Sequence, residues 1–258
     1  MQVDRNCARH SHPSILVQLV DLFLIELTNW RWSWRSMVIL GTASPLFGIL
    51  ALGVFARDAG RETLTYVLTG NLVVSLMLGN MGSVESHFTF MRFQGVLDYF
   101  ATLPIRRSAL ILAVVLAFLL IHLPSVVITV LLGSLFLQVP LKPHPIALLV
   151  APMCAIPLSG IGALIGTRAR TPQEASALGL LVTMAMAALG PVAVPPGRLP
   201  AAVLALGRLS PATYAASALR QALLGPVTGQ MAIDLAILAG FSVTIFWLVG
   251  RKMDWRQR

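Results

Sequence analysis

Long apolar blocks alternate with short polar connections along most of this chain. Six of these blocks approach the length of about 20 residues that a helix needs to cross the hydrocarbon core of a bilayer. None of the six has a lysine or arginine in its middle, where one would cost roughly 2.5–3.5 kcal/mol on insertion. The pattern therefore predicts an all-α membrane protein with six transmembrane helices. They are expected at residues 37–55, 66–84, 109–137, 146–167, 175–194 and 232–250.

The segment before the first block, residues 14–30, predicts an amphipathic helix that lies in the membrane plane. On a helical wheel, its polar residues share one side and its apolar residues share the other. The polar side holds Gln18, Asp21, Thr28 and Asn29, with Glu26 at its edge, and the apolar side holds Leu16, Leu19, Val20, Phe23, Leu27 and Trp30. The alternative is a seventh, imperfect span, and the two carboxylates inside the segment argue against it.

Residues 195–230 are apolar but are interrupted by several prolines. Two short helices fit this stretch, residues 200–207 and 211–224, and neither reaches the length of a span. Ser210 is a natural N-cap for the second helix, with Pro211 at its first position. The stretch predicts a re-entrant helical hairpin on the outer side of the membrane. Irregular backbone at membrane depth needs cover, so the hairpin is expected to pack against the spans.

Basic residues are distributed unequally over the connections between the blocks. Most of them lie in the head, in the second-to-third and fourth-to-fifth connections, and in the tail. The positive-inside rule places these segments in the cytoplasm. We therefore expect a multi-pass protein of the bacterial cytoplasmic membrane with both termini cytoplasmic. Residues 1–36 would form a cytoplasmic head that includes the interfacial helix.

The composition agrees with lipid as the solvent of this chain. Hydrophobic residues make up 57% and charged residues 11%, and the mean hydropathy is +0.81, whereas about a quarter of the residues of a soluble domain are charged. The net charge of +9 does not indicate nucleic-acid binding, because the basic residues fill the gaps between apolar blocks instead of gathering on one face. Cys7 lies in the polar head and Cys154 in an apolar block, so neither a disulfide framework nor a zinc site is expected.

Motifs for soluble catalysis are missing from the sequence. It has no phosphate-binding GxxxxGK[ST] loop, so the chain is expected neither to hydrolyse ATP nor to bind a cofactor. The spacing of its histidines and acidic residues predicts no metal site. Within the spans, His122 either lines a path or bonds a carbonyl freed by a kink at Pro124. Asn71 and Asn80 favour hydrogen bonds between helices over ligand contacts.

Three glycines, Gly160, Gly162 and Gly166, place small residues on one side of the fourth block. This pattern predicts close helix packing. The partner in that packing is either another span of this chain or a second copy of it.

The cytoplasmic connection of residues 85–108 carries a short amphipathic segment. Its apolar residues recur at near-helical spacing up to a proline: Val96, Leu97, Phe100, Leu103 and Pro104. A short amphipathic helix exposed to the cytoplasm fits a groove on a partner protein. The alternative is a helix that only lies on the membrane surface.

Two stretches of sequence carry a resemblance to a known family. The loop reads Arg92-Phe93-Gln94-Gly95-Val96-Leu97-Asp98-Tyr99-Phe100, then Thr102-Leu103-Pro104-Ile105-Arg106-Arg107. Before the last block stands Leu209-Ser210-Pro211-Ala212-Thr213-Tyr214, with Arg220 downstream. In this order they resemble the permease subunits of ABC-2 type ATP-binding cassette exporters, of the drug-exporter kind. One departure is Phe93, where many members carry a glutamate.

The resemblance implies a six-span permease domain over residues 37–258, with a coupling loop at 85–108 and the re-entrant segment at 195–230. It implies that two permease subunits, identical or different, pair around a central path, and that each binds an ATP-binding subunit, which holds ATP and Mg. By the same resemblance, the coupling residues are Arg92, Gly95, Val96, Leu97, Asp98, Phe100, Leu103 and Pro104. The residues of the re-entrant motif are Ser210, Pro211, Tyr214 and Arg220.

The expected function is export of a lipophilic small molecule or drug, as in multidrug efflux and antibiotic resistance, driven by a separate ATPase subunit. Apolar path walls and the lack of a large extracellular domain favour this cargo. Export of a glycoconjugate, polysaccharide or lipid by the same machinery is the alternative. A second alternative is a non-ABC membrane channel, or an intramembrane enzyme that uses His122 or Asp234.

Overall fold

The computed structural model describes residues 14–56, 60–103 and 105–252, and the regular secondary structure in these ranges is all helical. The longer helices are α1 (Ile15–Trp30), α2 (Trp34–Ala56), α3 (Arg61–Leu76), α4 (Gly82–Phe93), α6 (Arg107–Leu137), α7 (Ala147–Gly166), α8 (Pro172–Ala188), α10 (Pro211–Leu224) and α11 (Gly229–Lys252). The shorter ones are the π-helical turn η2 (Met77–Met81), α5 (Val96–Thr102), the 3₁₀ turn η3 (Pro196–Arg198) and α9 (Ala201–Gly207). The predicted all-α membrane fold is confirmed.

Five helical stretches are long and apolar enough to cross a membrane within the described residues. They are Trp34–Val54, Arg61–Phe93, Arg107–Leu137, Ala147–Gly166 and Gly229–Arg251. The predicted span at residues 175–194 instead forms α8, which has 17 residues and so covers only about 25 Å, short of a core of about 30 Å. The sixth span therefore stays a prediction.

The helix α8 ends early because of the glycine and proline that follow it. Gly190 has a φ of +128°, which a residue with a side chain rarely adopts, and Pro191 cannot extend a helix. A Cβ at Gly190 would also lie 2.5 Å from Thr213 Oγ1 and 3.1 Å from Gly207 Cα. This turn is thereby packed against the start of α10 and the end of α9.

The second span is longer than the sequence pattern predicts. Instead of ending at residue 84, the helix continues through α3, η2 and α4 to Phe93. Glu85, Ser86 and His87 were expected in the loop but lie on this helix, and Glu85 and His87 are buried. Instead of facing the cytoplasm, these side chains line a cavity, and His87 also has a polar partner.

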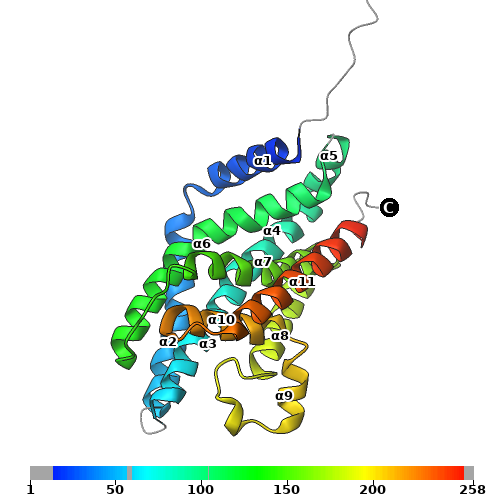
Figure 1. Cartoon of the computed structure of the whole chain (residues 1–258). Helices are drawn as coiled ribbons and strands as arrows, with labels where there is room; N and C mark the ends of the chain where they lie inside the picture. The colour runs from blue at the N-terminus through cyan, green and yellow to red at the C-terminus, as the bar shows by residue number, and fades with distance from the viewer. Residues whose placement is uncertain (1–13, 57–59, 104, 253–258) are drawn as a thin grey trace, which may run out of the picture.

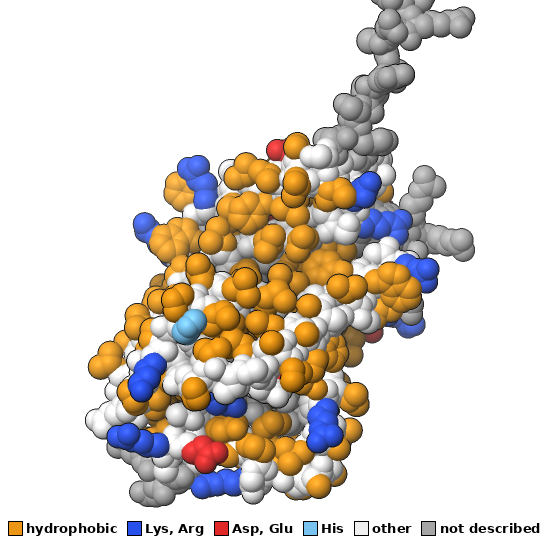
Figure 2. All heavy atoms as spheres, viewed as in Figure 1, with side chains coloured by type: hydrophobic (Ala, Val, Ile, Leu, Met, Phe, Trp, Pro, Cys, Tyr) orange, Lys and Arg blue, Asp and Glu red, His pale blue; other side chains and the backbone are white. Residues whose placement is uncertain are grey.

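The helices form a bundle whose two ends differ. Figure 1 shows α1 and α5 at one end and α9 at the other. The C-terminal part of α11 lies toward the α5 end, where Arg107 Nη1 donates a hydrogen bond of 3.4 Å to Gly250 O. Figure 2 shows apolar side chains over most of the middle of one face and basic side chains around its edges and ends, as a lipid-facing surface requires.

The face that α1 turns toward the bundle differs from the prediction. An interfacial helix turns its polar side to water, yet Gln18, Leu22 and Glu26 are the buried residues of α1. Polar groups inside the protein account for this: Gln18 Oε1 accepts a hydrogen bond from Arg106 N at 3.2 Å, and Glu26 pairs with His87. The helix itself is confirmed, but the predicted orientation is wrong, because Gln18 and Glu26 face the bundle and not water.

Close packing of α7 against its neighbours confirms the prediction from the three glycines and identifies the partners. A Cβ at Gly162 would overlap the carbonyl oxygen of Met81, and one at Gly166 would overlap that of Glu85. Gly160 faces Ile245 of α11. The partners are therefore other spans of this chain.

Gly162→Leu is expected to destabilise the bundle, because the obstacle is backbone, which cannot swing aside as a flexible side chain can. Overpacking of this kind costs about 3 kcal/mol, and we expect the melting temperature of the detergent-solubilised protein to fall by about 5 °C or more. Gly240→Leu in α11 is the matched control, because no atom lies within 4 Å of a Cβ there. Equal melting temperatures for the two variants would contradict the packing argument.

Candidate functional site

The predicted coupling loop is a sharp turn followed by a short helix. The turn is made at Gly95, whose φ of +71° lies in the left-handed region that favours glycine. The helix α5 follows directly, and Leu103 is extended at its end. Pro104 lies outside the described residues. The loop helix that the sequence pattern predicts is thus present over Val96–Thr102.

The apolar side of α5 faces its own bundle, which corrects the expectation that it is open to a partner. Leu97 is 4% exposed, and Val96 and Phe100 are half-buried against the same apolar cluster. That cluster also holds Phe88 of α4 and Leu110 of α6. The amphipathic spacing was correct, but the groove that receives it belongs to this chain.

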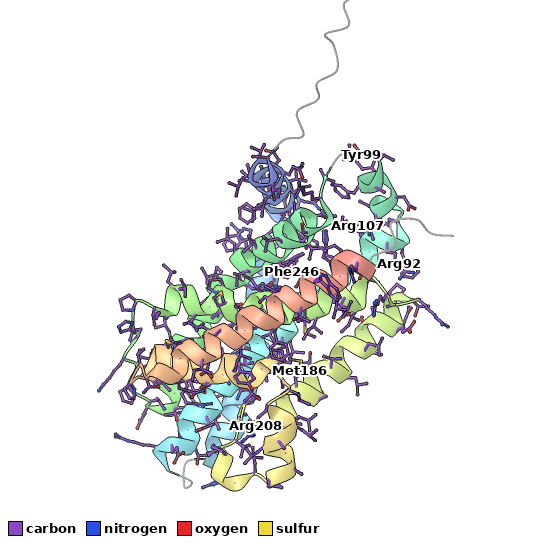
Figure 3. The ribbon with its side chains drawn as sticks, turned by 45° about the vertical axis from the view of Figure 1, so that its right-hand side comes forward. Arg92, Tyr99, Arg107, Met186, Arg208 and Phe246 are labelled. Carbon is purple, nitrogen blue, oxygen red and sulfur yellow. The ribbon has the colours of Figure 1, made fainter. Side chains whose placement is uncertain are left out.

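The opposite side of α5 is open. Asp98, Tyr99 and Leu103 are exposed, Tyr99 by 64% and Leu103 by 38%. Figure 3 shows Tyr99 at the end of the molecule, beyond Arg92 and Arg107. An aromatic ring beside a carboxylate, on a short helix that projects from the bundle, is a suitable contact surface for another protein.

Arg92 ties the end of α4 to the end of α7. Its Nη1 donates hydrogen bonds to Thr167 O at 2.9 Å and to Ala169 O at 3.0 Å. These carbonyls lie at the C-terminus of α7, where a helix leaves its last carbonyls unpaired and favours positive charge. The motif arginine thereby joins the loop after α4 to the connection between α7 and α8.

A cavity of about 570 Å³ lies beside α4, near the α5 end of the bundle. Its wall comes from the end of α1, the start of α2, the η2–α4 stretch, α6 and α8. Eight of the seventeen described residues in the lining are apolar or aromatic, among them Trp30, Phe90, Phe118 and Leu180. The polar part of the wall includes Glu85, Ser86 and Thr183.

A buried pair joins α1 to α4 at the edge of this cavity. His87 Nε2 and Glu26 Oε1 are 3.1 Å apart, and both side chains are buried. The Trp30 ring packs on the same histidine, with ring centroids 6.0 Å apart, and on Phe118, at 5.4 Å. The helix α1 is thus attached to the cavity wall by a polar and an aromatic contact.

The polar residues predicted inside the spans are held differently from expectation. His122 Nε2 lies 2.9 Å from Ser83 Oγ, so the histidine joins α6 to α4 and does not bond a carbonyl freed at Pro124. Asn71 Nδ2 donates to Val67 O at 2.9 Å, which is a bond within α3. Neither polar atom of the Asn80 side chain has a hydrogen-bond partner among the described residues. The prediction of hydrogen bonds between helices at Asn71 and Asn80 is therefore wrong for the described residues.

The re-entrant motif forms the two predicted helices, and α10 packs against α3, α7, α8 and α11. Ser210 is the N-cap residue before Pro211, but its hydroxyl makes no capping bond, which differs from the prediction. Tyr214 OH donates to Arg208 O at 2.8 Å, across the α9–α10 turn. Re-entry of this segment into the membrane stays a prediction.

Arg220 joins α10 to two other parts of the bundle. Its guanidinium lies 3.5 Å from the centroid of the Tyr66 ring in α3, a cation–π contact. Its Nη2 also donates to Val192 O at 3.4 Å. Burial lowers the pKa of this guanidinium, and nearby Tyr66, Glu62 and Asp234 oppose the shift.

Comparison with protein families decides the class of the chain. A sequence model of the ABC-2 type transporter family matches residues 18–224, which is most of the sequence. The chain belongs to the ABC-2 type transporter family. No curated protein matches it significantly.

Membership of the ABC-2 type transporter family fits the described features of the chain. It is a multi-pass membrane component of an ABC transporter, a permease subunit whose family works with an ABC ATPase subunit. In the part of the chain that the structure describes, no three His, Cys, Asp or Glu side chains are grouped as a metal site would need.

Two features of this ABC-2 permease were missed by reasoning from the sequence. Glu85 and the Glu26–His87 pair line or border the cavity, yet none of the three was among the predicted site residues. The available signal was weak: a carboxylate and a histidine directly after an apolar block, and a second carboxylate inside an apolar segment. Only the continuation of α4 past residue 84 brings them together.

Proposed function

We propose that this chain is the permease subunit of an ABC exporter and forms the path for a lipophilic small molecule or drug. A separate ATPase subunit, which holds ATP and Mg, supplies the energy. The complex lies in the bacterial cytoplasmic membrane, with both ends of the chain and α5 in the cytoplasm. Two permease subunits, identical or different, complete the path.

The observation that carries the proposal is the position of the cavity relative to α5. The same helix, α4, contributes Glu85, Ser86 and Phe90 to the cavity wall and leads through Arg92 and Gly95 into α5. A push on α5 therefore moves one wall of the cavity. The helix α4, which runs from the cavity wall to the turn before α5, is a suitable transmitter of rigid-body motion.

The exposed side of α5 supplies the contact with the ATPase subunit. Asp98, Tyr99 and Leu103 present a charge, an aromatic ring and an aliphatic side chain outside the bundle. The buried side, with Leu97, fixes α5 to α4 and α6. In this arrangement the residues of the coupling motif divide into an outer set that binds the ATPase and an inner set that passes the motion on.

The apolar lining of the cavity supports a lipophilic cargo. Three methionines and the rings of Trp30, Phe90 and Phe118 form part of the wall, and such surfaces bind varied apolar shapes. A polysaccharide or glycoconjugate needs hydrogen-bonding groups along its whole path, whereas about half of the described lining residues here are apolar or aromatic. A glycoconjugate stays the alternative cargo.

The proposal predicts ATP-dependent uptake of a lipophilic dye into inverted membrane vesicles that contain both this chain and its ATPase subunit. Vesicles with either subunit alone, or with an ATPase variant that lacks its phosphate-loop lysine, are expected to show no uptake. Dye flux through this chain alone, without ATP, would instead show a channel. ATP turnover by the isolated chain, lost on changing one of its own residues, would show an enzyme.

A further inference from the structure

The cavity beside α4 contains a buried acid, Glu85, that has no partner among the described residues. Glu85 is 4% exposed and lines the cavity, and no described residue forms a hydrogen bond or an ion pair with its carboxylate. Among the described lining residues, the other ionisable one is His87, which pairs with Glu26, and none is a lysine or an arginine.

The position of this carboxylate is fixed by its neighbours. Gly166 of α7 allows close approach of the backbone at Glu85, whose carbonyl oxygen accepts a hydrogen bond of 2.8 Å from Thr89 Oγ1. On the other side, a Cβ at Gly179 of α8 would overlap the Glu85 carboxylate. Two glycines on two helices thus make room for Glu85, and the acid lies between α4 and α8.

The aromatic and methionine side chains in the rest of the wall suit a ligand that is both positively charged and apolar. An unpaired buried carboxylate is unfavourable unless a positive charge reaches it. The faces of aromatic rings such as those of Trp30, Phe90 and Phe118 attract cations. Met37, Met77 and Met81 adapt to the shape of bulky apolar groups.

We propose that this cavity binds lipophilic organic cations, with the Glu85 carboxylate as their counter-ion. The inference narrows the cargo class of the proposed exporter and rests on that function, since the cavity is its path. The apolar part of the ligand contacts the aromatic and methionine side chains, and its positive centre lies toward the α4–α8 seam.

The test uses two probes of the same shape and opposite charge, tetraphenylphosphonium and tetraphenylborate. Their binding to the purified full chain in nanodiscs is measured by equilibrium dialysis, with empty nanodiscs subtracted. We expect the wild type to bind the phosphonium at least tenfold more tightly than the borate. Glu85→Gln is expected to weaken phosphonium binding at least tenfold without weakening borate binding, and Glu85→Asp is expected to keep the preference for the cation.

Glu174→Gln is the matched control, because Glu174 is an exposed acid in the first turn of α8 and lies outside the cavity lining. It is expected to leave both affinities unchanged. Equal affinity of the wild type for the two probes, or no effect of Glu85→Gln, would overturn the cation site. If Glu85→Gln does not fold, the relative affinity of the wild type for the two probes still tests the cation site.

This experiment contains no ATPase subunit and no transport step, so its failure is distinct from failure of the proposed function. Binding without charge preference, together with ATP-dependent dye uptake in vesicles, would refute the cation site and keep the exporter. Charge-selective binding without ATP-dependent uptake would keep the site and refute the exporter.

Discussion

Tyr99→Asp is expected to lower export strongly while the amount of the permease in the membrane stays normal. The side chain is 64% exposed, so its replacement changes the free energy of unfolding by no more than about 0.5 kcal/mol. In the complex, loss of a central aromatic contact costs about 2 kcal/mol or more, which weakens binding of the ATPase subunit by about 30-fold. Copurification with that subunit and ATP-dependent uptake in vesicles measure the two effects.

The control for Tyr99→Asp places the same charge at the other end of the bundle. Gly197 is exposed, and no atom lies within 4 Å of a Cβ built there. Gly197→Asp is therefore expected to be nearly silent in abundance, copurification and export. Normal export by Tyr99→Asp would show that the exposed side of α5 does not contact the ATPase.

Leu97→Asp is expected to impair folding itself, so that less folded permease is present in the membrane. Leu97 is 4% exposed and packs in the cluster with Phe88 and Leu110. The variant removes a buried leucine side chain and buries a carboxylate without a partner, a combined cost of roughly 4 kcal/mol or more. Membrane abundance and the melting temperature measure it.

Leu97→Met separates packing from polarity at this position, because the two side chains have similar volumes. It is expected to cost less than about 1.5 kcal/mol and to keep normal abundance and export. A well-expressed Leu97→Asp that lacks only the ATPase contact would return Leu97 to the outer set of coupling residues and contradict the observed packing.

The spans were predictable wherever composition alone decides them. The apolar blocks around α2, α6, α7 and α11 exclude charge over enough residues to require lipid or protein around them. The ends of α4 and α8 were not predictable in the same way. Whether a helix continues past Val84 depends on whether Glu85 and His87 find protein around them, and hydropathy does not contain that information.

The residues of the coupling helix were predictable from the sequence, but the surfaces that they face were not. The spacing of Val96, Leu97 and Phe100 correctly indicates a helix with one apolar side. It cannot tell whether that side meets a partner protein or the same chain, because both environments are equally apolar. Glu85 illustrates the opposite limit, since a single acid after an apolar block looks like an ordinary water-facing residue until Gly166 and Gly179 are seen around it.

The two hydrogen bonds of Arg92 have a mechanical consequence. Because its guanidinium donates hydrogen bonds to Thr167 O and Ala169 O, the α4–α5 turn and the short α7–α8 connection are expected to move together. α8 starts only a few residues beyond Ala169, at Pro172. In the proposed mechanism, a movement of α5 is therefore expected to reach both α4 and α8 and to change the width of the cavity between these two helices.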